Sequence, residues 1–422
     1  MQGSLRSYRR SILSLAALTL MLAPTLHAAA HEQVLYRFRG KTDGRFPSST
    51  LILDSSGNLY GTAGGGNTKN CVEGCGLVFE LAFSGGKWQE RVLYRFKGRK
   101  DGLDPRGNVV FDAKGNLYGT TYGGGSTTSC TAVPGCGTVF ELSPNGDGSW
   151  TETVIYKFQD SSDGALPVGL TIDASGNLYG TTIAGGSGTR GTVFALHRKG
   201  GAWKEATLFA FPDFEIEANP GLVFDAMGNL YGTWFQSYSC YPGCGSVFEL
   251  TPSGKDWQEN TLFNFVGGGN GGEPMDGVIL DSNGNIYGTG AEGGNNWGIA
   301  FELSLTDGQW TETIVHNFCD RNYCADGASP QSSLLFDPAG NLYGTAEGGG
   351  THCHPTCGLV FKLSPVRFGW HETVLHDFKG EPDGSSPTLG LTMDRGGNLY
   401  GTTPIGGTGP NSGYGTVFAI TP

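Results

Sequence analysis

One hexapeptide, Gly-Asn-Leu-Tyr-Gly-Thr, or a close variant of it, recurs seven times along this chain of 422 residues. Its asparagines are Asn58, Asn116, Asn177, Asn229, Asn285, Asn341 and Asn398, at spacings of 58, 61, 52, 56, 56 and 57 residues. A period this regular is typical of one supersecondary unit repeated about or along an axis. The repeat therefore constrains the fold strongly, whereas it says little about chemistry.

Each repeat unit is expected to contain four short strands and no helix. In the first copy, the apolar run 51–54 leads through the turn Asp54-Ser-Ser-Gly57 into residues 58–62, and 76–81 and 88–96 follow. Asp can accept hydrogen bonds from turn amides, and Gly supplies a positive φ. The alternation in the last run is typical of a half-buried strand. Four antiparallel strands per unit predict an all-β fold, a seven-bladed β-propeller.

The two ends of the repeat region indicate a closed ring. Six copies contain the fourth strand, which starts at Trp88, Trp150, Trp203, Trp257, Trp310 and Trp370, but the seventh copy stops after residues 415–420. The segment Glu32–Phe38 aligns position for position with Glu90–Phe96. The N-terminal strand is therefore predicted to complete the last blade and to remove an exposed sheet edge.

Residues 1–30 have the features of a secretory signal peptide. Arg6, Arg9 and Arg10 precede an apolar run at 12–22, and three alanines at 28–30 offer a cleavage site. The Arg9-Arg10 pair leaves twin-arginine export open beside the Sec route. Because no second apolar stretch is long enough to span a membrane, a soluble product is expected, secreted or periplasmic, with residues 31–422 as one propeller domain.

The charge of the chain excludes some partners. The formal net charge is −12, and removal of the leader with its three arginines makes it −15. A protein this acidic is a poor candidate for binding nucleic acid or an anionic membrane. We expect a monomer whose partner is a carbohydrate or another extracellular protein.

The ten cysteines fall into five close pairs. These are Cys71/Cys75, Cys130/Cys136, Cys240/Cys244, Cys319/Cys324 and Cys353/Cys357. An even count in an exported chain indicates disulfides. Zinc is an alternative only in the loop His352-Cys-His-Pro-Thr-Cys357, where four candidate ligands lie close together. We expect disulfides, no metal and no cofactor.

Propeller topology places all five pairs on one face. The loop between strands two and three shares that face with the connection from strand four to the next blade. Loops on a rigid scaffold commonly carry function, so this face is where we expect the site. Its candidate ligand-binding residues are Trp234, Phe235, Tyr238, Tyr241, Tyr122, Trp297, Glu292 and Glu347. Blade four departs most from the repeat, and its aromatic loop, held by Cys240/Cys244, is the first candidate for a contact surface.

Two interpretations stay open for these side chains and for the chemistry. The aromatic residues can bind sugar or pack against their own loops, and the recurring Asp-Gly of the connections can be turn chemistry. No nucleophile elbow, phosphate loop or His-Glu-x-x-His motif is present. A carboxylate pair for glycoside chemistry needs no local motif. The sequence favours a binding platform, with a polysaccharide hydrolase or lyase, or a lactonase, as the alternative.

The complete unit carries a resemblance. The Asp-x-x-Gly-Asn-Leu-Tyr segment resembles the propeller group of NHL-repeat proteins and streptogramin lyases at the level of the fold. With Gly-Thr-Val-Phe-Glu-Leu, Trp-x-Glu-Thr-Val-Leu-Tyr-x-Phe and Asp-Gly-x-x-Pro added, it resembles the GloVer tandem-repeat family of bacterial exported proteins, also called choice-of-anchor, over residues 32–422. The resemblance implies no catalytic residues. Family members carry various C-terminal anchors, and this chain shows none, so surface attachment is not expected.

Overall fold

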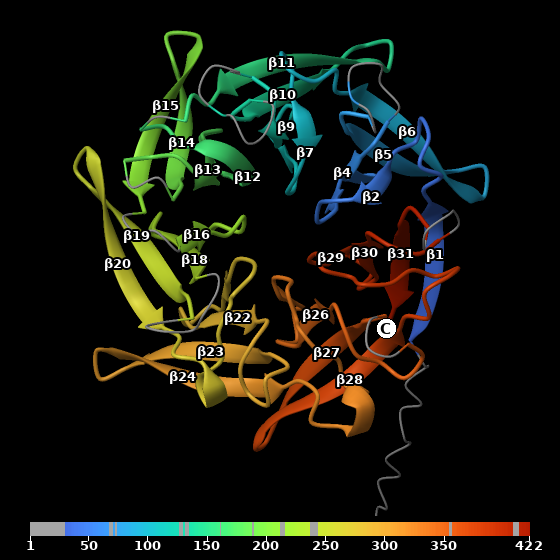
Figure 1. Cartoon of the computed structure of the whole chain (residues 1–422), viewed down its shortest axis with the longest axis vertical. Helices are drawn as coiled ribbons and strands as arrows, with labels where there is room; N and C mark the ends of the chain where they lie inside the picture. The colour runs from blue at the N-terminus through green and yellow to red at the C-terminus, as the bar shows by residue number, and fades with distance from the viewer. Residues whose placement is uncertain are drawn as a thin grey trace, which may run out of the picture.

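The structure, a computed structural model, describes residues 30–66, 71, 74–125, 130, 135–160, 162–187, 190–211, 216–236, 244–353, 357–407 and 413–422. These residues form seven antiparallel sheets, which stand as blades around a central axis (Figure 1). The seven-bladed propeller predicted from the repeat is confirmed. No helix in the described part of the chain is long and apolar enough to cross a membrane.

The first four blades follow one another along the chain. Blade 1 contains β2 (Arg45–Pro47), β3 (Ile52–Leu53), β4 (Leu59–Gly64), β5 (Leu77–Ser84) and β6 (Lys87–Arg95). Blade 2 contains β7 (Leu103–Pro105), β8 (Val110–Phe111), β9 (Leu117–Gly123), β10 (Thr138–Pro144) and β11 (Trp150–Lys157). Blade 3 contains β12 (Ala165–Ile172), β13 (Leu178–Ala184), β14 (Thr192–Lys199) and β15 (Ala202–Ala210). Blade 4 contains β16 (Ile216–Ala218), β17 (Val223–Phe224), β18 (Leu230–Gln236), β19 (Ser246–Ser253) and β20 (Asp256–Asn264).

The last three blades complete the ring. Blade 5 contains β21 (Ile279–Leu280), β22 (Ile286–Gly290), β23 (Ile299–Thr306) and β24 (Gln309–Asn317). Blade 6 contains β25 (Leu335–Phe336), β26 (Leu342–Ala346), β27 (Leu359–Val366) and β28 (Gly369–Asp377). Blade 7 contains β29 (Thr392–Met393), β30 (Leu399–Thr403), β31 (Thr416–Thr421) and, as its outermost strand, β1 (His31–Arg37). Two short 3-10 helices, η1 (Gly268–Asn270) and η2 (Asn322–Cys324), lie in connections between blades.

Ring closure follows the sequence prediction. β1 pairs antiparallel with β31, from His31 opposite Thr421 to Arg37 opposite Thr416. In Figure 1 the blue β1 lies beside the red β31, so that the first strand of the chain seals the last blade. The pairing leaves no open edge between blades 7 and 1.

The first strand of most blades differs from the expected continuous run. In blade 1 it is split into β2 and β3, and the intervening Ser48 accepts a backbone hydrogen bond from Gly107 of blade 2 (3.2 Å). The physical reason in blade 1 is competition, because the Ser48 carbonyl bonds the neighbouring blade and the ladder within its own blade is interrupted there. Among the described residues, one strand runs through this region only in blade 3, as β12.

The hydrophobic core lies between the blades, and one aromatic contact repeats at all seven boundaries. The phenylalanine that follows each fourth strand packs edge-to-face on a third-strand phenylalanine of the next blade. The pairs are Phe38–Phe79, Phe96–Phe140, Phe158–Phe194, Phe211–Phe248, Phe265–Phe301, Phe318–Phe361 and Phe378–Phe418, with ring centroids 5.0 to 5.8 Å apart. The backbone N–H of each leading phenylalanine also donates to a glycine carbonyl before the third strand of its own blade. Such ring pairs add to the free energy of simple burial.

A glycine–proline contact explains two further residues of the repeat at six of the seven boundaries. The glycine before the third strand of one blade lies against the first-strand proline of the next, at Gly76/Pro105, Gly137/Pro167, Gly245/Pro274, Gly298/Pro330, Gly358/Pro387 and Gly415/Pro47. A Cβ at these glycines would lie 2.1 to 2.8 Å from the proline Cδ. Because only glycine leaves room for that approach, and because its φ is positive at each position, the contact fixes both residue types.

Candidate binding pocket on the cysteine-bearing face

The disulfides confirm most of the predicted pairing and its location. Cys71–Cys75, Cys130–Cys136 and Cys353–Cys357 lie in loops between strands two and three, and Cys319–Cys324 lies in the connection after blade 5. Cys244 is also disulfide-bonded, whereas Cys240 lies outside the described residues. We call the face that carries these loops the cysteine-bearing face.

The second cysteine of a pair accepts a backbone hydrogen bond from the next blade. The carbonyl of Cys75 accepts a hydrogen bond from the N–H of Asp104 (2.9 Å), the residue before the proline of blade 2. Cys136, Cys244 and Cys357 make the same bond to Leu166, Glu273 and Ser386. In blades 5 and 7 the position is held by Trp297 and Tyr414, which accept from Ser329 and Phe46. The disulfide-bonded cysteines are therefore structural parts of the contact between neighbouring blades.

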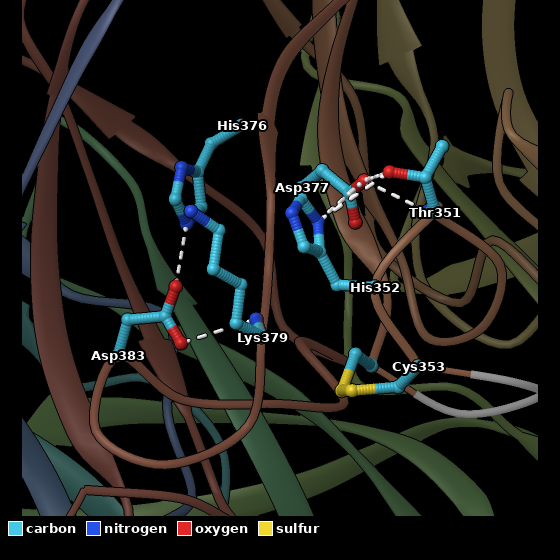
Figure 2. The surroundings of a disulfide bond; sticks show 8 residues. Thr351, His352, Cys353, His376, Asp377, Lys379 and Asp383 are labelled. Atoms are coloured by element: carbon cyan, nitrogen blue, oxygen red, sulfur yellow. Dashed lines mark hydrogen bonds and ion pairs between the residues drawn. A yellow bond between two sulfur atoms is a disulfide. The ribbon is translucent and has the colours of Figure 1, made fainter.

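The loop that was an alternative zinc site contains a disulfide. The sulfur atoms of Cys353 and Cys357 are bonded to each other (Figure 2), so they are not the thiolates that zinc requires. His352 Nδ1 lies 3.0 Å from Asp377 Oδ2, and the same carboxylate oxygen accepts from Thr351 Oγ1 at 2.6 Å. Across the described ranges, no three His, Cys, Asp or Glu side chains are arranged to hold a metal ion.

The recurring aspartates of the connections act in turns. Asp43 Oδ2 accepts hydrogen bonds from the Tyr36 hydroxyl and the Arg39 N–H, both at 3.0 Å. Asp101 and Asp163 bond a tyrosine hydroxyl and a backbone N–H in the same way. In the connection from blade 6 to blade 7, His376 of β28 takes the place of the tyrosine beside Asp383, as Figure 2 shows. These carboxylates stabilise the connections between blades through hydrogen bonds. This agrees with the interpretation of the Asp-Gly motif as turn chemistry.

The blade-four candidates lie in a strand. Trp234 and Phe235 belong to β18, where they pair with Ala218 and Glu217 of β16. Trp234 is half-buried and packs against the core cluster that contains Phe211. Its equivalents in the other blades are all small and buried: Ala63, Thr121, Thr182, Gly290, Ala346 and Thr403. Tyr238 and Tyr241 lie outside the described residues.

The acidic candidates and Trp297 lie on blades 5 and 6. Trp297 is 45% exposed. Glu292 lies beside Glu273, and burial together with the Glu292 carboxylate raises the pKa of Glu273. Glu347 accepts a hydrogen bond from Gln331, and burial raises the pKa of this carboxyl. This group is separate from Tyr122, which lies on blade 2, on the other side of the ring (Figure 1).

Tyr122 lines a pocket between blades 1 and 2. The Arg106 guanidinium lies over the Tyr122 ring at 4.2 Å, and Asp104 holds it through Nε and Nη2, both at 2.9 Å. From blade 1, Arg45 lies over the ring of Phe46 at 5.1 Å. The pocket has a volume of about 600 Å³, and the other residues that line it are Ser48, Gly64, Gly65, Gly74, Cys75, Gly76 and Leu103. We call it the inter-blade pocket.

The shape of the backbone brings the two aromatic rings to this pocket. Phe46 stands at a register shift between β2 and β4 with φ of 49°, and its side chain is 42% exposed. A bulged residue of this kind re-aims its side chain. Ser48 Oγ donates to the carbonyl of Pro105 (2.9 Å), and Thr120 Oγ1 donates to that of Arg106 (3.0 Å). The first bond joins blades 1 and 2, and the second holds the backbone of Arg106 within blade 2.

Two other hollows have similar volumes but a different origin. They measure about 590 and 600 Å³ and lie on the opposite face, between neighbouring Asp-x-x-Gly turns. Their aromatic residues, Phe111 and Tyr118, pack into the core. Both hollows follow from the repeat itself, whereas the inter-blade pocket is lined by residues that vary between blades.

Sequence reasoning missed Arg45, Phe46, Asp104 and Arg106. All four flank the proline of the Asp-Gly-x-x-Pro motif. The constant residues of the motif are compatible with a turn, whereas its variable positions before the proline hold Arg45, Phe46 and Asp104. A side chain that varies inside an otherwise constant unit was the available signal.

Comparison with known proteins places the fold and the family. Polysaccharide lyase Uly1 is 10% identical, with 92% of this chain and 98% of that chain covered and a TM-score of 0.54. The periplasmic gluconolactonase PpgL of Pseudomonas aeruginosa is 15% identical, with 79% and 85% covered and a TM-score of 0.47. The aldose sugar dehydrogenase of Streptomyces coelicolor, in its PQQ-bound form, is 10% identical, with 93% and 98% covered and a TM-score of 0.46.

At these identities the likeness concerns the propeller fold alone. No curated protein matches the chain. The Gloeobacter/Verrucomicrobia repeat matches residues 67–239 and 221–422, which together make up most of the sequence. The chain therefore belongs to the Gloeobacter/Verrucomicrobia repeat family.

Proposed function

We propose that this protein is an exported carbohydrate-binding propeller that holds a saccharide in the inter-blade pocket. The observation that carries the proposal is the pairing of two aromatic rings, the exposed Phe46 and the half-buried Tyr122, with hydrogen-bonding side chains in one hollow of the cysteine-bearing face. Sugar rings offer apolar faces and polar edges, so an aromatic wall with a few polar groups suits them. Disulfides are typical of oxidising compartments, and they support export.

The pocket has the size and rigidity that such binding needs. Its volume of about 600 Å³ lies in the range of small-molecule sites. Cys75, which is tied to Cys71, contributes to the wall, and its carbonyl fixes Asp104. A wall that is already ordered lowers the entropy cost of binding. Glycines at 64, 65, 74 and 76 leave the floor open to a ligand.

The test is binding to a glycan array, followed by calorimetry on the glycans that are retained. Tyr122→Ala and Phe46→Ala should each weaken binding about tenfold, because aromatic anchors dominate binding in pockets. Phe368→Ala is the matched control, since that ring is 84% exposed and lies in the turn between β27 and β28 on the opposite face. An array without retained glycans, or Tyr122→Ala with parental affinity, would refute the proposal.

Catalysis is the second candidate, and the carboxylates of blade 5 favour it. Glu273 and Glu292 adjoin each other on the cysteine-bearing face, and the raised pKa of Glu273 is suited to a general acid. The same glycans are incubated with protein and assayed for new reducing ends. Cleavage that Glu273→Gln abolishes would establish a hydrolase or lyase, whereas intact glycans support a binding protein.

A further inference from the structure

The lining of the inter-blade pocket differs in charge from the protein as a whole. The chain has a net charge of −12, yet the charged residues that line the pocket are two basic ones, Arg45 and Arg106, and one acidic one, Asp104. The hollow between the turns at Asp112 and Asp173 is lined by two basic and three acidic residues. The third hollow has one basic residue and two acidic ones. Of these three hollows, only the inter-blade pocket is lined by more basic than acidic residues.

We infer that the ligand of the inter-blade pocket is a sugar acid, namely a uronate residue within an acidic oligosaccharide. The inference rests on the proposed carbohydrate binding and names its substrate class. A uronate combines a ring that can lie on Phe46 or Tyr122 with a planar carboxylate that a guanidinium can bind through two parallel N–H···O bonds. A neutral sugar would offer no anion to the donors of Arg106 that Asp104 leaves unused.

Arg106 is preorganised for this role. Its Nε and Nη2 atoms bond Asp104, and its planar group is stacked on Tyr122. The guanidinium is thereby fixed in orientation while Nη1 keeps its donors, and the side chain is 49% exposed. A planar, fixed donor group loses less entropy on binding a carboxylate than a free side chain does.

Asp104 limits which anions fit. Its carboxylate takes up one edge of the Arg106 guanidinium and repels an anion that approaches from that side. A ligand must therefore meet Arg106 from the side of the pocket, where Arg45 and the ring of Phe46 form the opposite wall. This arrangement favours one carboxylate attached to a sugar ring over a densely charged polyanion.

The probes are tetrasaccharides of galacturonate, mannuronate, guluronate and glucuronate, and each is paired with its methyl-esterified form. The ester keeps the rings and linkages and removes the charge, so the pair isolates the carboxylate. We expect at least one acid to bind about tenfold or more tightly than its ester, since hydrogen bonds to charged groups are the strong ones. Its affinity should fall as the salt concentration rises.

The variants are Arg106→Gln and Arg45→Gln. Each should remove the preference for the acid while leaving the ester's affinity within about threefold, because the aromatic walls remain. Arg367→Gln is the matched control, since Arg367 lies over the Phe368 ring at 5.1 Å in a turn of the opposite face. Melting temperatures of all variants establish that they are folded.

The outcomes separate this inference from the proposed function. Binding of neutral glycans or esters with equal or weaker binding of the acids refutes the uronate and leaves carbohydrate binding intact. An acid preference that survives in Arg106→Gln and Arg45→Gln also refutes it, because the anion would then bind elsewhere. An acid preference that both variants remove and Arg367→Gln retains supports it.

Discussion

Trp234 differs in size from the residues at the same position of the other blades, yet its side chain still packs against the core. It occupies a position that is small and buried in the other blades, and it reaches the boundary with blade 3, where Phe211 and Tyr179 lie. The matching residue of the next strand is Ser246, whereas blades 2, 3 and 7 pair two threonines at this place. The indole therefore fills space that two hydroxyl-bearing side chains fill elsewhere.

Replacing Trp234 by Ala should consequently destabilise the protein. A half-buried indole that is removed from a packed boundary leaves a cavity, and we expect the free energy of unfolding to fall by about 2 kcal/mol. Denaturation in urea measures it. Phe368→Ala, on an 84% exposed ring, should stay near the parent. A Trp234→Ala protein as stable as the parent would instead leave this side chain available for the contact surface predicted for blade 4.

At the scale of the elements, the ring is closed by β1, the first strand of the chain, which pairs with β31, the last strand. β1 and the residue that follows it supply the buried Leu35 and Phe38 to the boundary between blades 7 and 1, where they pack with Phe79 and Leu81. β1 also covers the outer edge of β31. Blade 7 thus depends on a strand that is far from β31 in the sequence, so no short loop holds the two strands together.

Deletion of Glu32–Phe38 should open the ring. β31 would then expose an unpaired edge and the apolar side chains of the boundary, so we expect a lower melting temperature, a broader transition and self-association. Calorimetry and light scattering report these changes. A synthetic peptide of residues 32–38 added in trans should restore the parental transition, as strand addition does at other sheet edges. A truncated protein that stays monomeric and melts like the parent would contradict the shared blade.

The repeat allowed these elements to be predicted, because its phase fixes which residues face the core. The alignment of Glu32–Phe38 with Glu90–Phe96 was enough to predict β1 in blade 7. The split of the first strand was not predictable in this way, since it depends on a bond from Gly107 to Ser48 of another blade. The pocket was missed for the same reason: Phe46 and Tyr122 come from different copies, and only the ring brings them together.

At the scale of the whole molecule, the glutamate at one position of the fourth strand, two residues after the tryptophan, has a raised pKa in five blades. Burial raises the pKa of Glu90, Glu152, Glu205, Glu312 and Glu372 to about 7. In blades 1 and 2 the neighbouring aspartates Asp43 and Asp101 raise it further. A folded-state pKa above the ordinary value means that the folded protein binds the proton more tightly than the unfolded chain.

Stability should therefore fall as the pH rises. The protonated glutamates stabilise the fold fully below their unfolded pKa, and this contribution is lost as pH increases from about 4.5 to about 7. We expect a higher melting temperature at pH 5 than at pH 8. Glu90→Gln, which keeps the shape without the charge, should reduce the difference, and Asp256→Asn, an exposed change in β20, should not. A melting temperature that increases between pH 5 and pH 8 would contradict the prediction.

The glycine–proline contact between blades has a consequence for how such a molecule can arise. At six of the seven boundaries a blade offers its proline to the preceding neighbour or its glycine to the following one, so the boundary is a head-to-tail contact between two unlike surfaces of the same unit. Subunits with contacts of this type assemble into cyclic oligomers. A single blade of this type therefore carries both halves of such a boundary. Duplication of its coding segment could lengthen the chain blade by blade, and each new copy would fit its neighbours without a compensating substitution.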